Sequence, residues 1–138
     1  MRIFLDTDVI LDCVLARPGF EQDASTLLNL CETGKVEGMT SLLILANCHY
    51  VFSKQDTAAK SRKVIASLRA FLEVCSIGDR ELSEALVSKF KDLEDGLQYF
   101  TALNHQADVI ITRNTRDFKP SSLPVMLPKE FLLTFGLR

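Results

Sequence analysis

Two short runs of the sequence contain only large apolar residues and then stop at a polar one. Residues 3–5 read Ile-Phe-Leu and lead into Asp6, and residues 109–111 read Val-Ile-Ile and lead into Thr112. A strand without alternating polar positions is buried on both faces, as an inner strand of a parallel sheet is. The two runs therefore predict central strands that are covered by helices on both sides.

The segments between and around these runs have mostly helical spacing of apolar residues. We expect Asp8 to cap the first helix, Ser41 to cap the third, and short further strands at 36–40 and 75–77. The predicted helices cover residues 9–16, 20–33, about 41 onward, 56–74, 80–90, 92–106 and 129–135. Strands that alternate with helices predict an α/β fold, a three-layer α/β/α sandwich with a central parallel sheet.

Length and composition support one folded unit. The chain has 138 residues, of which 47% are hydrophobic, so we expect a single domain over 1–138 with a well-buried core. There are 16 basic and 18 acidic residues, which give a net charge of −2. This balance provides no overall attraction for a polyanion, so a nucleic-acid role must come from a local site.

The cysteines and the apolar segments bear on location. Cys13, Cys31, Cys48 and Cys75 are spaced singly, which predicts reduced thiols in a cytoplasmic protein. Charges at the start of the chain argue against a signal peptide. The longest apolar stretch, 42–52, is interrupted by polar residues and too short to cross a bilayer, so we expect no membrane association.

Three acidic residues fall where such a fold would bring them together. Asp6 directly follows the first apolar run, Asp95 lies early in the predicted helix 92–106, and Asp117 follows the last apolar run by a few residues. Ligands of open α/β sheets bind beyond the carboxyl ends of the strands. Three carboxylates in one cleft repel one another unless they are protonated or hold a divalent cation such as Mg²⁺ or Mn²⁺. A cation there can position a phosphodiester and activate water, which predicts a metal-dependent nuclease.

Each of these acids alone also has an ordinary structural explanation. Asp6 or Asp8 can cap a helix, and Asp92 with Asp95 suits the partly positive first turn of one. Asp117 can form a local turn within its loop. Their shared position, more than any single residue, favours a site.

Four segments, in this order along the chain, resemble the successive motifs of PIN-domain proteins. They are Phe4–Asp12, Thr40–Val51, Asp92–Tyr99 and Asp108–Phe118. The similarity is strongest to the branch of VapC-type toxins of toxin–antitoxin systems, and it covers almost the whole chain. It implies a metal-dependent ribonuclease that acts on RNA, has a cognate antitoxin and forms a homodimer.

The resemblance also implies roles for particular residues. Asp6, Asp95 and Asp117 match the catalytic metal ligands, and Asp92 matches a position that can serve as an outer ligand. Glu94 is rotated by about 100° from Asp95 on the helix, so it is a weaker candidate for a ligand.

Residues of the last motif and Asp8 are auxiliary candidates. Thr112 is placed to orient a carboxylate or a water through its hydroxyl, and Asn114 belongs to the same motif. Arg113 and Arg116 flank the acids and can hold phosphates, although solvated loop charge is the simpler explanation for each. Asp8 can reach the site, and helix capping explains it equally well.

One residue departs from the family pattern. Many PIN domains have Glu as their second acid, and Asn47 occupies that position here. An Asn oxygen can ligate a metal but adds no charge, so attraction for Mg²⁺ should fall. Asn47 therefore keeps open a second hypothesis, a catalytically weakened PIN-like binding module that acts through protein or RNA partners.

A third hypothesis concerns the acids at the start of the chain. Asp6-Thr7-Asp8 is similar to the Asp-x-Asp of haloacid-dehalogenase-like phosphatases. That family has a turn after the second Asp, whereas here Val9 continues an apolar helical segment. We therefore place this hypothesis below the other two.

Overall fold

The computed structural model describes residues 1–136, so the last two residues of the predicted domain lie outside the described part. Its centre is a five-stranded sheet with the order β3-β2-β1-β4-β5, in which each neighbouring pair is parallel. The strands are β1 (Arg2–Leu5), β2 (Glu37–Ser41), β3 (Glu73–Cys75), β4 (Val109–Ile111) and β5 (Val125–Met126).

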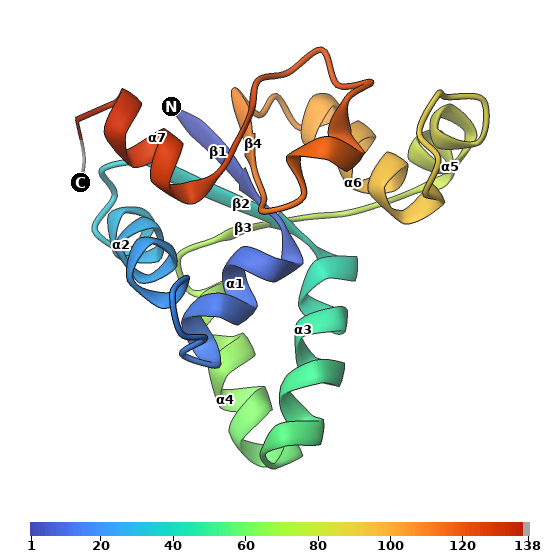
Figure 1. Cartoon of the computed structure of the whole chain (residues 1–138). Helices are drawn as coiled ribbons and strands as arrows, with labels where there is room; N and C mark the ends of the chain where they lie inside the picture. The colour runs from blue at the N-terminus through green and yellow to red at the C-terminus, as the bar shows by residue number, and fades with distance from the viewer. Residues whose placement is uncertain (137–138) are drawn as a thin grey trace.

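Helices cover both faces of this sheet. Helices α1 to α4 lie on one side, and α5 and α6 lie on the other (Figure 1). The predicted three-layer α/β/α sandwich is confirmed. The helices are α1 (Thr7–Val14), α2 (Glu21–Glu32), α3 (Leu42–Gln55), α4 (Ala58–Arg69), α5 (Asp79–Leu86), α6 (Leu93–Asn104) and α7 (Pro128–Thr134), and Thr115–Phe118 form a 3₁₀ helix, η1.

The two apolar runs are neighbours in the middle of the sheet. Ile3 pairs with Val109, and Phe4 pairs with Ile110, in parallel register. The buried core extends from these strands into the helices on both sides. Burying each such side chain contributes about 1.5–3 kcal/mol, which explains why the pattern of these runs determines the fold.

Strand order reverses at the boundary between β1 and β4. From β1 the chain moves outward to β2 and β3, and it then crosses back to place β4 and β5 on the other side of β1. The crevice at such a reversal, beyond the carboxyl ends of the strands, is where open α/β sheets bind ligands. Asp6 follows β1 and Thr112 follows β4, so both residues lie at this point.

Several boundaries differ from the sequence prediction. The cap of α1 is Asp6, not Asp8, because the Asp6 side chain accepts a hydrogen bond from the backbone N–H of Thr7. Helix α4 is shorter than the predicted 56–74. Thr57 caps its start, accepting from the N–H of Lys60 at 3.1 Å, and its end precedes β3, which begins at Glu73. Strand β5 was not predicted, since two residues are too few for a periodic signal.

Two further expectations concern thiols and membranes. The four cysteines are free, and burial raises the pKa of Cys31 and of Cys48 to about 12, so these two thiols stay protonated at neutral pH. Among residues 1–136, no helix combines the length and the apolarity that crossing a bilayer requires.

Candidate functional site

Asp6 is held at the strand reversal through both carboxylate oxygens. Its Oδ1 accepts from the N–H of Thr7 at 2.8 Å, and its Oδ2 accepts from the hydroxyl of Thr112 at 2.8 Å. Thr112 is fully buried. The end of β4 therefore fixes the side chain that caps α1, and the carboxylate faces the crevice with little freedom. Burial raises the pKa of Asp6, and the two hydrogen bonds oppose this change.

Asp8 lies beside Asp6, and only one of its two carboxylate oxygens has hydrogen-bond partners among residues 1–136. Its Oδ2 accepts from the N–H of Arg113 at 3.0 Å and from the Thr112 hydroxyl at 3.4 Å. Its Oδ1 is buried and has no hydrogen-bond partner among residues 1–136. Burial first, and then the negative charge of Asp6, raise the pKa of Asp8 to about 6. A buried carboxylate oxygen without a donor is suited to receive a cation or a proton.

Asp95, in the first turn of α6, is electrostatically coupled to the other acids. Partial burial raises its pKa to about 7, and the charges of Asp92, Asp6 and Asp117 contribute in decreasing order. Asp92 is the N-cap of α6, and its Oδ1 accepts from the N–H of Asp95 at 3.1 Å. Asp92 therefore has a capping role in the structure and adds negative charge beside Asp95.

The acidic residues line two adjoining cavities that share Asp95. The first lies between α1, α3 and α6 and is lined by Asp6, Asp8, Asn47, Glu94 and Asp95, with Arg17 and Asn114 at its margin. The second, of about 420 Å³, lies between α6 and η1 and contains Asp92 and Asp117 as well as Asp95. The residues that were predicted to bind one metal ion are thus distributed over two cavities, which have Asp95 in common.

Asn47 faces the first cavity and contacts Glu94, which the sequence indicated only as a weaker ligand candidate. Its Nδ2 donates to Oε1 of Glu94 at 2.8 Å. Glu94 therefore adds a carboxylate next to the position where Asn47 lacks one. Helical rotation argued against Glu94, yet at the first turn of α6 both it and Asp95 line this cavity. The position of α3 opposite α6 determines this, and it has no local sequence signal.

Arg113 has a partner that differs from the expected phosphate. Its Nε and Nη2 donate to the two carboxylate oxygens of Asp12 at 2.7 and 2.9 Å, and its guanidinium lies 4.0 Å from the centre of the Phe20 ring. Asp12 is 1% exposed. Since a bidentate Arg–carboxylate pair is strong and directional, the Arg113 side chain is committed to this pair and its backbone N–H to Asp8. Asp12 follows Asp8 by four residues and therefore lies on the same helix face. This spacing is the sequence feature that could have indicated Asp12 as a residue near the site.

The donor set fits a hard divalent cation in chemistry. Carboxylate and amide oxygens are the ligands that Mg²⁺ and Mn²⁺ take, and the unpartnered Oδ1 of Asp8 offers one such oxygen. Within the described residues, no three His, Cys, Asp or Glu side chains are grouped closely enough to form a ready metal site. The acids are near enough for their charges to raise the pKa values of Asp8 and Asp95, but in this structure they are not grouped as a complete set of metal ligands.

Comparison with known proteins identifies the family. The model of the PIN domain family matches residues 2–116, so the chain belongs to the PIN domain family, as the motifs predicted. This match favours a PIN domain over the phosphatase hypothesis for Asp6-Thr7-Asp8. The chain is also similar to Ribonuclease VapC1 of Aquifex aeolicus (strain VF5), with 27% identity over 135 residues that cover 94% of this chain and 92% of the relative.

Solved structures have the same fold. One is VapBC2 from Rickettsia felis bound to a DNA fragment from its promoter, with a TM-score of 0.71, 17% identity, and coverage of 92% of this chain and 98% of that chain. Another is a toxin–antitoxin complex from Klebsiella pneumoniae, with a TM-score of 0.67, 24% identity, and coverage of 91% and 97%. The arrangement of strands and helices is thus shared over nearly the full length.

Proposed function

We propose that this protein is a divalent-cation-dependent ribonuclease and the toxin of a toxin–antitoxin pair. The observation that carries the proposal is the position of Asp6, Asp8 and Asp95 at the strand reversal. Burial raises the pKa of each of them, and the charges of neighbouring acids raise the pKa values of Asp8 and Asp95 further. Repulsion between buried carboxylates lowers the stability of a fold, whereas the same carboxylates attract a divalent cation in a metal site. The similarity to a VapC ribonuclease supports RNA as the substrate.

The residues would have distinct roles in metal binding and positioning. Asp6, Asp8 and Asp95 would hold Mg²⁺ or Mn²⁺, with Asp117, Asn47 and Asp92 as further or outer ligands. When bound, the cation lowers the pKa of a water and offsets the charge that develops on the phosphate. Thr112 keeps Asp6 oriented through its 2.8 Å hydrogen bond. The Asp12–Arg113 pair fixes the loop whose N–H groups contact Asp8 and Thr112.

Cleavage of RNA by the purified protein tests this proposal. We expect cleavage of single-stranded or structured RNA with Mg²⁺ or Mn²⁺ and none after chelation. Asp6→Asn should abolish cleavage while the circular dichroism spectrum stays that of the folded chain, because Asn keeps the shape of Asp without its charge. Cleavage that is indifferent to a chelator would refute the metal mechanism.

The proposed partners are a second copy of the chain and a small antitoxin. Large apolar side chains stand exposed around α5 and the start of α6, with Leu86 64%, Val87 87% and Leu93 45% exposed, and such a surface supports a homodimer. The negative charge around Asp95 favours an antitoxin segment that carries an Arg. Light scattering that finds only monomer at high micromolar concentration would contradict the dimer.

The antitoxin has its own test, and so has the compartment. A protein encoded beside this gene should co-purify with the chain and inhibit it, and failure to do so would count against the pair. We place the toxin in the cytoplasm, where free thiols persist and RNA is available. Fractionation of cells that express the protein would check this location.

Asn47 supports a second candidate function, a PIN domain that binds partners without cleaving RNA. The Asn47 side chain lines the cavity with Asp6 and Asp95 and brings no charge to it. A calorimetric titration with Mg²⁺ separates the two functions. Binding together with cleavage supports the nuclease, and the absence of both supports the binding module.

A further inference from the structure

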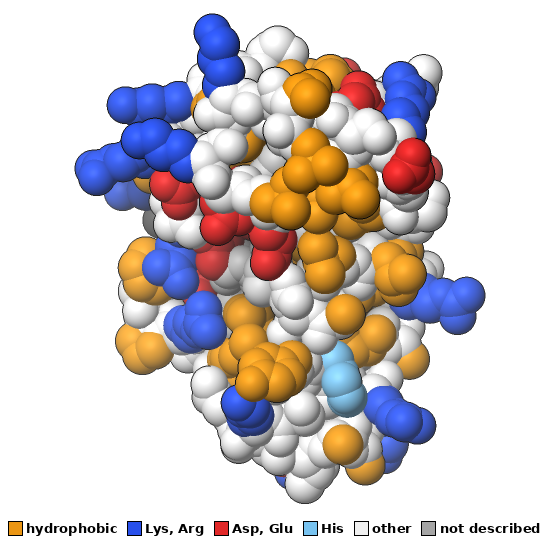
Figure 2. All heavy atoms as spheres, turned by 90° about the vertical axis from the view of Figure 1, so that its right-hand side faces the viewer, with side chains coloured by type: hydrophobic (Ala, Val, Ile, Leu, Met, Phe, Trp, Pro, Cys, Tyr) orange, Lys and Arg blue, Asp and Glu red, His pale blue; other side chains and the backbone are white. Residues whose placement is uncertain are grey.

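Four basic side chains surround the cavity between α6 and η1. Lys89 and Lys91 come from the segment between α5 and α6, and Arg116 and Lys119 come from η1 and the residue after it. All four are exposed. Figure 2 shows Lys and Arg side chains gathered beside the acidic side chains on this face of the molecule. We call these four residues the basic rim.

The basic rim has no structural partner. Within residues 1–136, none of its four side chains takes part in an ion pair, a hydrogen bond or an aromatic contact, although Asp92, Asp95 and Asp117 line the same cavity. Other arginines of the chain are engaged, as Arg2 and Arg113 are. Four basic side chains without partners, beside three carboxylates that form no ion pair within residues 1–136, indicate a ligand that uses both signs of charge.

An aromatic contact links the two basic segments that line the cavity. Phe90 lies between Lys89 and Lys91 in the sequence, and its ring packs edge-on against Phe118 with centroids 5.9 Å apart. Phe90 also packs on Tyr99 of α6 at 5.1 Å. Phe118, which is 2% exposed, anchors the segment of Arg116 and Lys119 in the same way. The basic side chains are thus presented from anchored backbone and not from a free loop.

We infer that the basic rim binds the phosphate backbone of the RNA substrate next to the scissile bond, on the η1 side of the acids. This inference rests on the proposed function, because the cation held by the acids is what lets a phosphodiester lie beside them. The neighbouring phosphates of the same strand then contact the rim. We favour RNA over an acidic peptide because the proposed reaction already places a phosphodiester at the cation, and the chain of the RNA then holds further phosphates beside the rim.

The test compares two rim variants with a matched control. Lys89→Gln/Lys91→Gln and Arg116→Gln/Lys119→Gln each remove two rim charges. Arg62→Gln/Lys63→Gln removes two charges from α4, which lies at the far end of the molecule from α6 (Figure 1). Binding of a fluorescent single-stranded RNA is measured with Ca²⁺ in place of Mg²⁺ at several salt concentrations, and kcat and KM are measured with Mg²⁺. Poly-glutamate of equal length serves as a competitor.

We expect each rim variant to bind RNA about tenfold more weakly, with a salt dependence that is reduced by about 0.7 in log–log slope per lost phosphate contact. KM should rise by a similar factor while kcat stays within about twofold, because the cation ligands are intact. The control should change neither the slope nor KM.

Three results would overturn the inference. Equal weakening by the α4 control would mean diffuse charge, and unchanged slopes in the rim variants would mean no phosphate contact there. Stronger competition by poly-glutamate than by unlabelled RNA would assign the rim to an acidic protein segment. A wild-type protein that binds RNA through the rim and never cleaves it would refute the proposed nuclease function, but it would still support RNA binding by the basic rim.

Discussion

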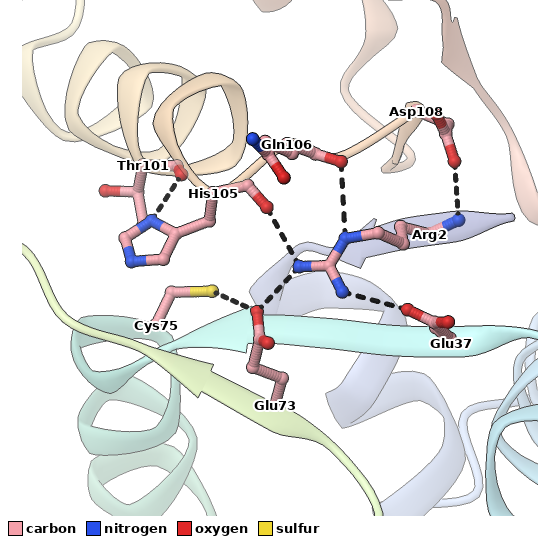
Figure 3. A network of polar contacts seen from close by, with 8 residues as sticks. All are labelled: Arg2, Glu37, Glu73, Cys75, Thr101, His105, Gln106 and Asp108. Atoms are coloured by element: carbon pink, nitrogen blue, oxygen red, sulfur yellow. Dashed lines mark hydrogen bonds and ion pairs between the residues drawn. The ribbon is translucent and has the colours of Figure 1, made fainter.

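The two ends of the central sheet treat charge in opposite ways. At the amino end, Arg2 joins three chain segments in one network (Figure 3). Its guanidinium donates to Glu37 and Glu73 at 2.9 Å each and to the carbonyl oxygen of His105 at 2.8 Å. Its backbone N–H donates to Asp108 at 2.7 Å. Each of these charges has a partner, and the pKa of Arg2 is raised, first by its hydrogen bond to Glu37.

At the carboxyl end, like charges gather instead. Burial raises the pKa values of Asp6, Asp8 and Asp95, and neighbouring negative charges raise those of Asp8 and Asp95 further, so the charged forms are disfavoured. The amino end therefore stabilises the fold, whereas the carboxyl end retains repulsion that a cation would relieve. The contrast separates charges that hold the sheet together from charges that are available for chemistry.

The largest expected effect comes from removing one of the gathered acids. Asp95→Asn should lower cleavage by more than about 100-fold, since even outer partners of metal ligands cost about 10–100-fold when they are changed. The same substitution should raise the melting temperature in metal-free buffer, because it removes a repelling charge beside Asp6. Initial rates and thermal melts of the two proteins check both statements.

The matched control for Asp95→Asn is Asp79→Asn in the first turn of α5. It removes one acidic charge from a helix start outside both cavities, so cleavage should persist. If the variant Asp95→Asn cleaves RNA at the wild-type rate, the acids at the carboxyl end of the sheet do not serve catalysis as proposed.

The next largest effect is on stability at the amino end. Arg2→Met should lower the free energy of unfolding by about 1–2 kcal/mol, because its ion pairs are partly exposed and weak while its hydrogen bonds to the backbone carbonyls of His105 and Gln106 are also lost. Cleavage per folded molecule should be unchanged. Urea denaturation gives the first quantity and active-site titration the second.

The exposed ion pair between Lys60 of α4 and Asp56, the C-cap of α3, is the reference for this measurement. Lys60→Met breaks an ion pair with Asp56 in which the side chains are 68% and 37% exposed, and it should cost less than about 0.5 kcal/mol. Arg2→Met with no greater cost than Lys60→Met would show that the network in Figure 3 is not a stabilising one.

A smaller effect is expected at Asn47, where a substitution can add charge to the carboxyl end of the sheet. Asn47→Glu places a carboxylate near the cation, an attraction of roughly a few kcal/mol at an effective dielectric near 20 before desolvation and repulsion are subtracted. It also replaces the 2.8 Å donor to Glu94 with a like charge. We expect moderately tighter Mg²⁺ binding and lower stability without metal.

Asn47→Leu is the opposite variant. It should weaken Mg²⁺ binding and leave the metal-free stability equal or higher. Calorimetric Mg²⁺ titration of the three proteins, beside melts with and without metal, decides between them. Equal affinities in all three would place Asn47 outside the metal site.

The sequence predicted the features that depend on local patterns. The apolar runs 3–5 and 109–111 indicated the central strands, and the parallel sheet then placed Asp6 near Thr112. What it missed depends on packing between distant segments. No local pattern indicates that α3 brings Asn47 to Glu94, or that Asp12 would bind Arg113 and withdraw it from the cavity. The sequence identified the acids, and the structure was needed to find their neighbours.

The smallest expected effect is the pH dependence of the metal-free protein. The folded pKa values of about 7 for Asp95 and about 6 for Asp8 lie above the value near 3.9 of an unfolded Asp. The folded chain therefore binds more protons, so the stability from these groups is complete below about pH 4 and is lost as pH rises towards 7. We expect the melting temperature in chelator to fall by a few degrees between pH 5 and 7.5, since solvent screening reduces the effect at partly exposed Asp95. Asp95→Asn should flatten this fall and Mg²⁺ should oppose it, because the cation favours the charged carboxylates. A melting temperature that rises with pH over this range would mean that the acids are not held against repulsion.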